Sequence, residues 1–140
     1  MTASDLARIL PGSTTKGPDR HWKTLKADSK RVREGDAFIA LKGSLTDGHK
    51  YIPDALSRGA GIIICNAGFC TENTGATVLS VPDTKAALNM ILPVLYPKAL
   101  EVTMVGITGT NGKTTTTYLI ESVLESAGIS TGVIGTINTR

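Results

Sequence analysis

The sequence predicts an α/β protein whose sheet is mostly parallel. Short apolar runs at residues 36–41, 61–65 and 77–81 are bounded by charged, glycine or proline residues, a pattern typical of buried strands. Segments with apolar residues at helical spacing alternate with these runs. Alternating strands and helices usually pack as parallel strands joined by crossover helices, so the order of the elements indicates the fold class. Further strands are predicted at residues 102–108 and 131–137.

Helices are predicted where a capping residue or a first-turn proline precedes a periodic apolar pattern. Ser4 or Asp5 is expected to cap a helix that runs to Leu10. Residues 11–20 are rich in glycine, proline, serine and threonine, and are expected to form a loop. The remaining helices are predicted at residues 52–59, with Pro53 in the first turn, from Asp83 or Thr84 to Leu95, with a kink or early end at Pro93, and from Lys113 to Ala127.

The chain is expected to comprise one small α/β domain and the beginning of a second. The boundary is predicted near residues 97–101, which assigns residues 1–98 to the first domain and 99–140 to the second. The second part would be a β-α-β unit of about forty residues, which buries too little apolar surface to be stable alone. We therefore expect the second domain to be incomplete in this sequence.

Composition and charge argue against several classes of function. Of the 140 residues, 41% are hydrophobic and 19% are charged, as in an ordinary globular protein. The net charge is +3, and a basic stretch runs from Lys16 to Arg33 with Trp22 as its one aromatic residue. Such a stretch offers no stacking platform, so nucleic acid is not an expected partner. Because neither a secretory signal nor a membrane-spanning run is recognisable, we expect a cytoplasmic location and no membrane insertion.

A phosphate-binding loop is predicted at residues 108–115. The sequence Thr-Gly-Thr-Asn-Gly-Lys-Thr-Thr follows an apolar run and precedes an amphipathic segment, which is the context of a P-loop. Gly109 and Gly112 would let backbone N–H groups approach phosphate oxygens. The generic P-loop pattern has a glycine at the position of Ile107, so the match departs from the pattern at one residue.

Two polar residues of this loop have specific expected roles in binding ATP and Mg²⁺. Lys113 would place a positive charge at the β- and γ-phosphates, and the Thr114 hydroxyl would ligate the metal ion. These two are the candidate catalytic residues, and Thr114 is the candidate metal ligand. The candidate nucleotide-binding residues are Gly109, Thr110, Asn111, Gly112, Lys113, Thr114 and Thr115.

His21 and His49 have no local partner set, so neither is expected to act as a general base or metal ligand.

Two blocks of the sequence resemble the Mur ligases, in family order and with family spacing. The first comprises ADSKRVREGDAFIALKG at residues 27–43 and DGHKYIPDALSRGA at 47–60, and is similar to their N-terminal UDP-binding domain. The second comprises MVGITGTNGKTTTTYLI at 104–120 and GVIGTI at 132–137, and resembles the opening of their central ATPase domain. The run of four threonines from Thr114 to Thr117 favours the group that adds the third residue of the peptide.

The resemblance implies an ATP-dependent ligase of peptidoglycan synthesis. Such an enzyme phosphorylates the carboxylate of UDP-N-acetylmuramoyl-L-alanyl-D-glutamate, and the amine of meso-diaminopimelate or L-lysine then attacks the acyl phosphate. The resemblance also implies that the Asp28–Lys30 turn and the loop from Gly43 to Gly48 line the uridine diphosphate site. The candidate substrate-binding residues are Ser29, Gly43, Ser44 and Thr46. This loop reads Ser-Leu-Thr where some members have His-Gln-Ala. The parts that select the amino acid follow the P-loop domain in this family, so the 140 residues alone are expected to have no ligase activity.

Three alternatives remain open from the sequence. The dipeptide-adding Mur ligases share the upstream block, but they more often have serine at the position of Thr110. A non-catalytic UDP-sugar-binding remnant would bind UDP without ATP turnover. A folylpolyglutamate synthetase has the same P-loop variant, but lacks a counterpart of residues 24–60.

Overall fold

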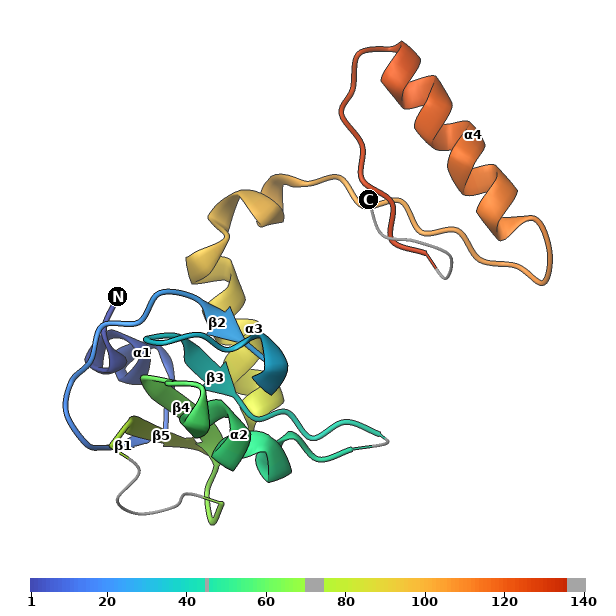
Figure 1. The fold of residues 1–140 in the computed structure, drawn as a ribbon. Helices are drawn as coiled ribbons and strands as arrows, with labels where there is room; N and C mark the ends of the chain where they lie inside the picture. The colour runs from blue at the N-terminus through green and yellow to red at the C-terminus, as the bar shows by residue number, and fades with distance from the viewer. Residues whose placement is uncertain (45, 70–74, 136–140) are drawn as a thin grey trace. The chain divides into compact units, whose positions relative to one another are not determined.

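The sheet forms where apolar runs allow both of its faces to be buried. A computed structural model describes residues 1–44, 46–69 and 75–135. The central strands are β3 (Ala37–Ile39), β4 (Ile62–Asn66) and β5 (Thr77–Val81), and β1 (Thr14–Lys16) and β2 (Leu25–Lys26) lie at the edges (Figure 1). The strand order is β1-β5-β4-β3-β2, with β2 to β5 parallel and β1 antiparallel to β5. The prediction of an α/β fold with mostly parallel pairing is confirmed.

Alternate residues of the strands build two separate cores, one on each face of the sheet. This follows from the two-residue period of a strand, which directs successive side chains to opposite faces. One core contains strand residues together with α1 (Ala3–Ile9) and α3 (Thr84–Leu95), and the other contains strand residues together with α2 (Ile52–Ser57). The strand residues of the first core are Ala37, Ile39, Ile62, Ile64, Leu79 and Val81; those of the second are Phe38, Ile63, Cys65 and Val78.

Local capping chemistry determines where the helices begin. The N-cap of α1 is Thr2, whose hydroxyl accepts from the N–H of Asp5 at 3.3 Å while Asp5 accepts from the N–H of Thr2 at 2.8 Å. The prediction of Ser4 or Asp5 as the cap was therefore wrong, because Asp5 is the third residue of a capping box. Asp83 caps α3 as predicted, but this helix continues past Pro93 to Leu95 rather than ending early.

One predicted loop and two predicted strands differ from the structure. Residues 11–20 contain β1, which has no apolar signature because its three residues are exposed. Residues 102–108 form no strand, and neither do residues 131–135, the described part of the strand predicted up to Ile137. A strand needs a neighbouring strand for its backbone hydrogen bonds. Within the described residues, no other segment forms a strand beside these two.

The chain divides into two compact units, Met1–Glu101 and Val102–Arg140. The first contains the sheet, helices α1 to α3 and three short 3₁₀ helices, η1 (Ser29–Arg31), η2 (Gly48–Tyr51) and η3 (Pro97–Glu101). The second contains α4 (Lys113–Ser126), none of whose residues is buried. A long apolar helix that would cross a membrane is not found in the described part of the chain.

Candidate functional site

The predicted phosphate loop leads directly into the first turn of α4. Gly112 is the N-cap residue and has a φ of +75°, a left-handed conformation that favours glycine. Among the residues that the structure describes, no side chain caps this helix end. The first hydrogen bond of the helix runs from the N–H of Thr116 to the carbonyl of Gly112 at 2.9 Å. The N–H groups of the first turn therefore have no intrahelical acceptor, and together with the helix dipole they form a site suited to an anion.

Lys113 places its ammonium group over the same loop. Its Nζ donates to the carbonyl oxygen of Gly109 at 2.6 Å and to that of Thr110 at 3.5 Å. The side chain thus folds back across the loop from the first position of the helix. A positive charge beside uncapped backbone N–H groups matches what the phosphates of a nucleotide require.

The residues at this helix end also fit Mg²⁺ held jointly with phosphates. Thr114 lies in the first turn of α4 and is exposed. In the described ranges, no group of three or more His, Cys, Asp or Glu residues is placed to hold a metal ion. Mg²⁺ commonly takes one or two protein oxygens and completes its shell with water and phosphate oxygens. One threonine hydroxyl next to a phosphate site fits this kind of coordination.

Ser29, the predicted uridine contact, is buried at the start of η1. Its hydroxyl beside the Asp54 carboxylate of α2 is the main cause that lowers the pKa of Asp54 below 3.8. The Nε of Arg58 donates to the same carboxylate, at 3.1 and 3.2 Å to its two oxygens. Ser29 therefore joins η1 to α2, and Asp54 is a partner of this residue that no local sequence signal indicated.

The loop between β3 and η2 contains the other predicted substrate residues. Ser44 and Thr46 are exposed, and the N–H of Gly43 donates to the carbonyl of Thr46 at 2.9 Å. Lys42 and Asp47 form an antiparallel bridge, so the two ends of the loop meet at its base. The polar groups of residues 43, 44 and 46 thus belong to one closed loop.

Ser29 and this loop lie at the end of the sheet formed by the carboxyl ends of the parallel strands. Strands β2 and β3 are parallel, and each is followed by one of these segments, η1 after β2 and the loop after β3. The carboxyl ends of parallel strands meet at the same edge, which is where open α/β sheets bind ligands. Helix α2 contacts both η1 and η2. The topology therefore brings the predicted uridine residues to the same end of the sheet.

His49, which lacks partners in the local sequence pattern, has two in the structure. Its Nδ1 lies 2.6 Å from Oδ1 of Asp47, and its Nε2 accepts from the backbone N–H of Asn66 at 3.0 Å. The sequence indicated no local partner set for this histidine, and the structure places beside it both Asp47, two residues away, and Asn66, which only the fold brings near. The backbone N–H of His49 also donates to Asp47, and the two bonds together lower the pKa of Asp47 below 3.8.

We expect the folded state to lose stability as the pH falls through the acidic range. The pKa values of Asp5, Asp19, Asp47 and Asp54 are all lowered by hydrogen bonds formed in the folded chain. The unfolded chain therefore binds more protons, and the contribution of these carboxylates is present above the unfolded value of 3.8 and lost below it. The melting temperature from circular dichroism should fall between about pH 5 and pH 2.5. Asp47→Asn should flatten this dependence, and a melting temperature constant over the range would contradict the prediction.

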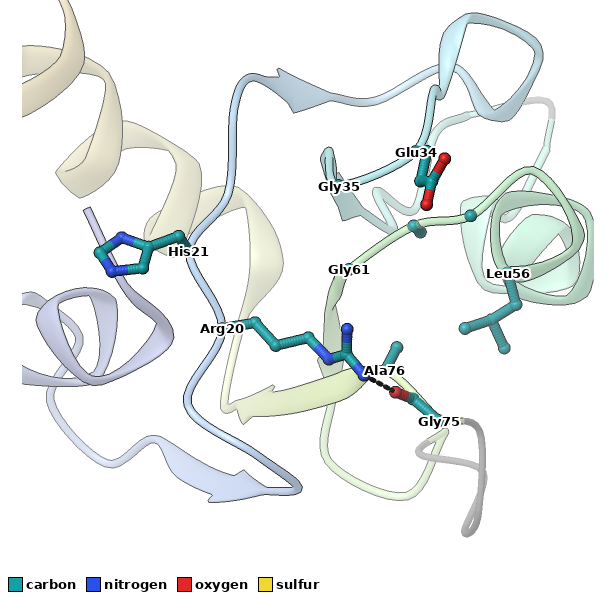
Figure 2. Close-up of a pocket in the computed structure, with 10 residues that line it drawn as sticks. Arg20, His21, Glu34, Gly35, Leu56, Gly61, Gly75 and Ala76 are labelled. Atoms are coloured by element: carbon teal, nitrogen blue, oxygen red, sulfur yellow. Dashed lines mark hydrogen bonds between the residues drawn. The ribbon is translucent and has the colours of Figure 1, made fainter.

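A cleft lies at the other end of the sheet, beside the amino ends of the parallel strands. Its volume is about 500 Å³, and it is lined by residues that precede strands β3, β4 and β5, among them Gly35, Gly61 and Ala76. Figure 2 shows the Arg20 guanidinium reaching the Gly75 carbonyl, to which it donates at 3.0 Å, while the His21 ring points away from it. None of the predicted site residues lines this cleft.

Residues 21–110 of the chain match the Mur ligase family, catalytic domain, and residues 107–140 match the Mur ligase middle domain. The chain belongs to the Mur ligase family. The family match confirms the resemblance drawn from the two sequence blocks.

Several curated Mur ligases that resemble this chain carry the same name. The chain is 41% identical over 143 residues to the UDP-N-acetylmuramoyl-L-alanyl-D-glutamate–2,6-diaminopimelate ligase of Geobacter metallireducens, covering 100% of this chain and 28% of that protein. It is 42% identical over 119 residues to the ligase of the same name from Aquifex aeolicus, covering 84% of this chain and 24% of that protein. The chain therefore spans about a quarter of the length of these relatives.

Solved structures of a different Mur ligase also resemble this chain. One is the UDP-N-acetylmuramoylalanyl-D-glutamyl-2,6-diaminopimelate–D-alanyl-D-alanyl ligase of Acinetobacter baumannii, with a TM-score of 0.64, 27% identity, and coverage of 89% of this chain and 28% of that one. Another is the MurF ligase of Thermotoga maritima in complex with ADP, with a TM-score of 0.50, 30% identity, and coverage of 76% and 23%.

Proposed function

We propose that this chain forms the precursor-binding and phosphate-binding parts of a ligase that adds 2,6-diaminopimelate to UDP-N-acetylmuramoyl-L-alanyl-D-glutamate. The main support is the 41% identity, along the whole chain, with a relative named for that reaction. The uncapped start of α4 with Lys113 beside it supports the use of ATP. L-Lysine was equally open as the added residue from the sequence alone, and the names of the relatives favour diaminopimelate.

In this proposal, residues 1–98 bind the UDP-linked precursor and residues 99–140 begin the ATP-binding domain. Lys113 and the first-turn N–H groups of α4 hold the β- and γ-phosphates of ATP. Thr114 ligates Mg²⁺, which when bound offsets the charge of the transferred phosphoryl group. The nucleotide part of the precursor contacts Ser29 and the loop residues Gly43, Ser44 and Thr46. Because ATP and UDP-linked precursors are cytoplasmic compounds, the enzyme acts in the cytoplasm.

The proposal predicts one specific ligation. The full product of the gene that encodes this chain should form UDP-N-acetylmuramoyl tripeptide from the dipeptide precursor, ATP and meso-diaminopimelate, with release of ADP and phosphate. Coupled ADP detection together with mass spectrometry of the nucleotide product measures both outcomes. Replacing meso-diaminopimelate by L-lysine should leave the rate at background. Preferential use of L-lysine would refute the proposed amino acid, while the ligase proposal would stand.

A dipeptide-adding ligase is the second candidate, and the TM-score of 0.64 with the Acinetobacter baumannii enzyme favours it. The same assay distinguishes the two groups, because that enzyme class extends a tripeptide precursor with D-alanyl-D-alanine. Formation of a pentapeptide product from the tripeptide precursor would therefore establish the second candidate. UDP binding without ADP release under either condition would instead indicate a binding module.

A further inference from the structure

The loop at residues 42–47 is fixed to the body of the fold at its base. Gly48 follows the loop, and its N–H donates to the carbonyl of Leu41 at 2.9 Å. A side chain at Gly48 would lie 2.6 Å from that same oxygen, so the two ends of the loop approach each other as closely as backbone atoms allow. This close approach places Asp47 beside Lys42. The position of the loop therefore depends on what holds Asp47.

His49 holds Asp47 through two bonds to one oxygen. Its backbone N–H lies 3.0 Å from Oδ1 of Asp47 and its Nδ1 lies 2.6 Å from the same atom. The side chain of His49 is only 4% exposed, and its ring packs against that of Phe69 with a centroid distance of 4.2 Å. An imidazole that is buried and bonded at both nitrogens has little freedom to rotate, so it holds the carboxylate in one place.

The other ring nitrogen connects this loop to the neighbouring strand. The backbone N–H of Asn66, at the end of β4, points at Nε2 of His49 from 3.0 Å. A nitrogen that faces an N–H donor must accept, so the proton of the neutral ring resides on Nδ1 and is donated to Asp47. One tautomer therefore satisfies both partners.

Asn66 is itself fixed by the segment that follows β5. Its Oδ1 accepts from the hydroxyl of Thr84 at 2.9 Å, and its Nδ2 donates to the carbonyl of Pro82 at 3.2 Å. Thr84 is the first residue of α3 and is buried. A continuous set of hydrogen bonds thus runs from the loop, through His49 and Asn66, to the start of α3.

We propose that His49 is a positioning residue for the UDP-linked precursor, acting through Asp47 on the loop of residues 42–47. The inference rests on the proposed function, because it assigns the loop to the nucleotide of the precursor. His49 itself makes no contact with substrate in this scheme. Its Nδ1–H keeps Asp47 in place, and Asp47 keeps Gly43, Ser44 and Thr46 in the conformation that binds UDP.

Two conservative substitutions of His49 distinguish a role in positioning the loop for UDP from a role in the stability of the fold alone. Asparagine at position 49 can place an amide N–H near the site of Nδ1 and so keep the bond to Asp47, while losing the bond to Asn66. Glutamine can place its carbonyl oxygen near the site of Nε2 and keep the bond from Asn66, while losing the side-chain bond to Asp47. Each variant loses one buried hydrogen bond, so a purely structural role of His49 predicts that both variants lower UDP affinity equally.

The test measures UDP affinity of the 140-residue chain by isothermal titration calorimetry, with melting temperatures as the folding control. His49→Ala and His49→Gln should each weaken UDP binding about tenfold, whereas His49→Asn should stay within about threefold of the wild type. Equal affinities for the asparagine and glutamine variants would overturn the positioning role. If the wild-type chain does not bind UDP, the proposed function fails first, and this inference fails with it.

A second measurement examines the hydrogen-bond geometry without any substitution. Long-range ¹H–¹⁵N correlation spectra of the histidine rings should show His49 as the neutral tautomer protonated at Nδ1. Protonation at Nε2 in the neutral ring would contradict the bond from Asn66, and would overturn the inference even if UDP binds.

Discussion

Replacing Lys113 by alanine is expected to lower ATP-dependent ligation by the full enzyme by about two to three orders of magnitude. Lys113 stands at the first position of α4, and its ammonium group lies 2.6 Å from a carbonyl oxygen of the loop. It therefore places a positive charge beside the uncapped N–H groups of this helix end. Charge that develops on a transferred phosphoryl group has to be offset by such groups, so the loss should appear mainly in kcat.

A matched control separates this effect from a change of net charge. Lys98 lies in η3 and is exposed, and it is not among the residues of either candidate site. Lys98→Ala removes the same charge and should leave kcat and the KM for ATP unchanged. Lys113→Ala with near-normal kcat would mean that the helix N-terminus alone handles the phosphates, and the role assigned to Lys113 would be wrong.

Gly48→Ala is expected to destabilise the first unit by about 1–3 kcal/mol and to weaken UDP binding. A Cβ at this position would lie 2.6 Å from the oxygen and 2.7 Å from the nitrogen of Leu41, and both atoms belong to the backbone. Relief therefore requires the end of β3 or the loop itself to move. Urea denaturation measures the loss of stability, and calorimetry with UDP measures the loss of affinity.

Gly106→Ala is the appropriate control for this substitution. A Cβ at Gly106 would meet no atom of the described residues within 4 Å, and like Gly48 this residue does not have a positive φ. The same change of side chain should therefore leave both stability and UDP affinity as in the wild type. If Gly48→Ala were as stable as this control, the close approach to Leu41 would not be a constraint on the loop.

The sequence allowed prediction of elements whose signal is local. Strands β4 and β5 coincide with continuous apolar runs, and the N-cap of α3 was recognisable from Asp83 followed by a periodic pattern. Strand β1 could not be recognised, because its exposed residues have no apolar period and it is recruited by pairing with β5. The reverse holds for residues 102–108, whose apolar run predicts a strand although no described segment pairs with it.

The residues of the candidate sites also differ in whether the sequence alone could predict them. The P-loop is a contiguous motif, so its residues can be named from the sequence alone, and their chemical roles remain predictions. The contact of His49 with Asn66 was not predictable, because Asn66 lies 17 residues away and reaches the ring only through the register of the parallel sheet. The position of Ser29 beside Asp54 likewise depends on how η1 packs against α2.

Trp22 is the chain's one tryptophan, and it is a member of the core that packs against α1 and α3. Trp22 is buried, with 8% of the residue exposed. The tryptophan emission of this chain therefore reports on the first unit, which contains the residues predicted to bind uridine. Tryptophan fluorescence should therefore distinguish a titration with UDP from a titration with ATP without any added label. Only a ligand that affects the unit of residues 1–101 should change that emission.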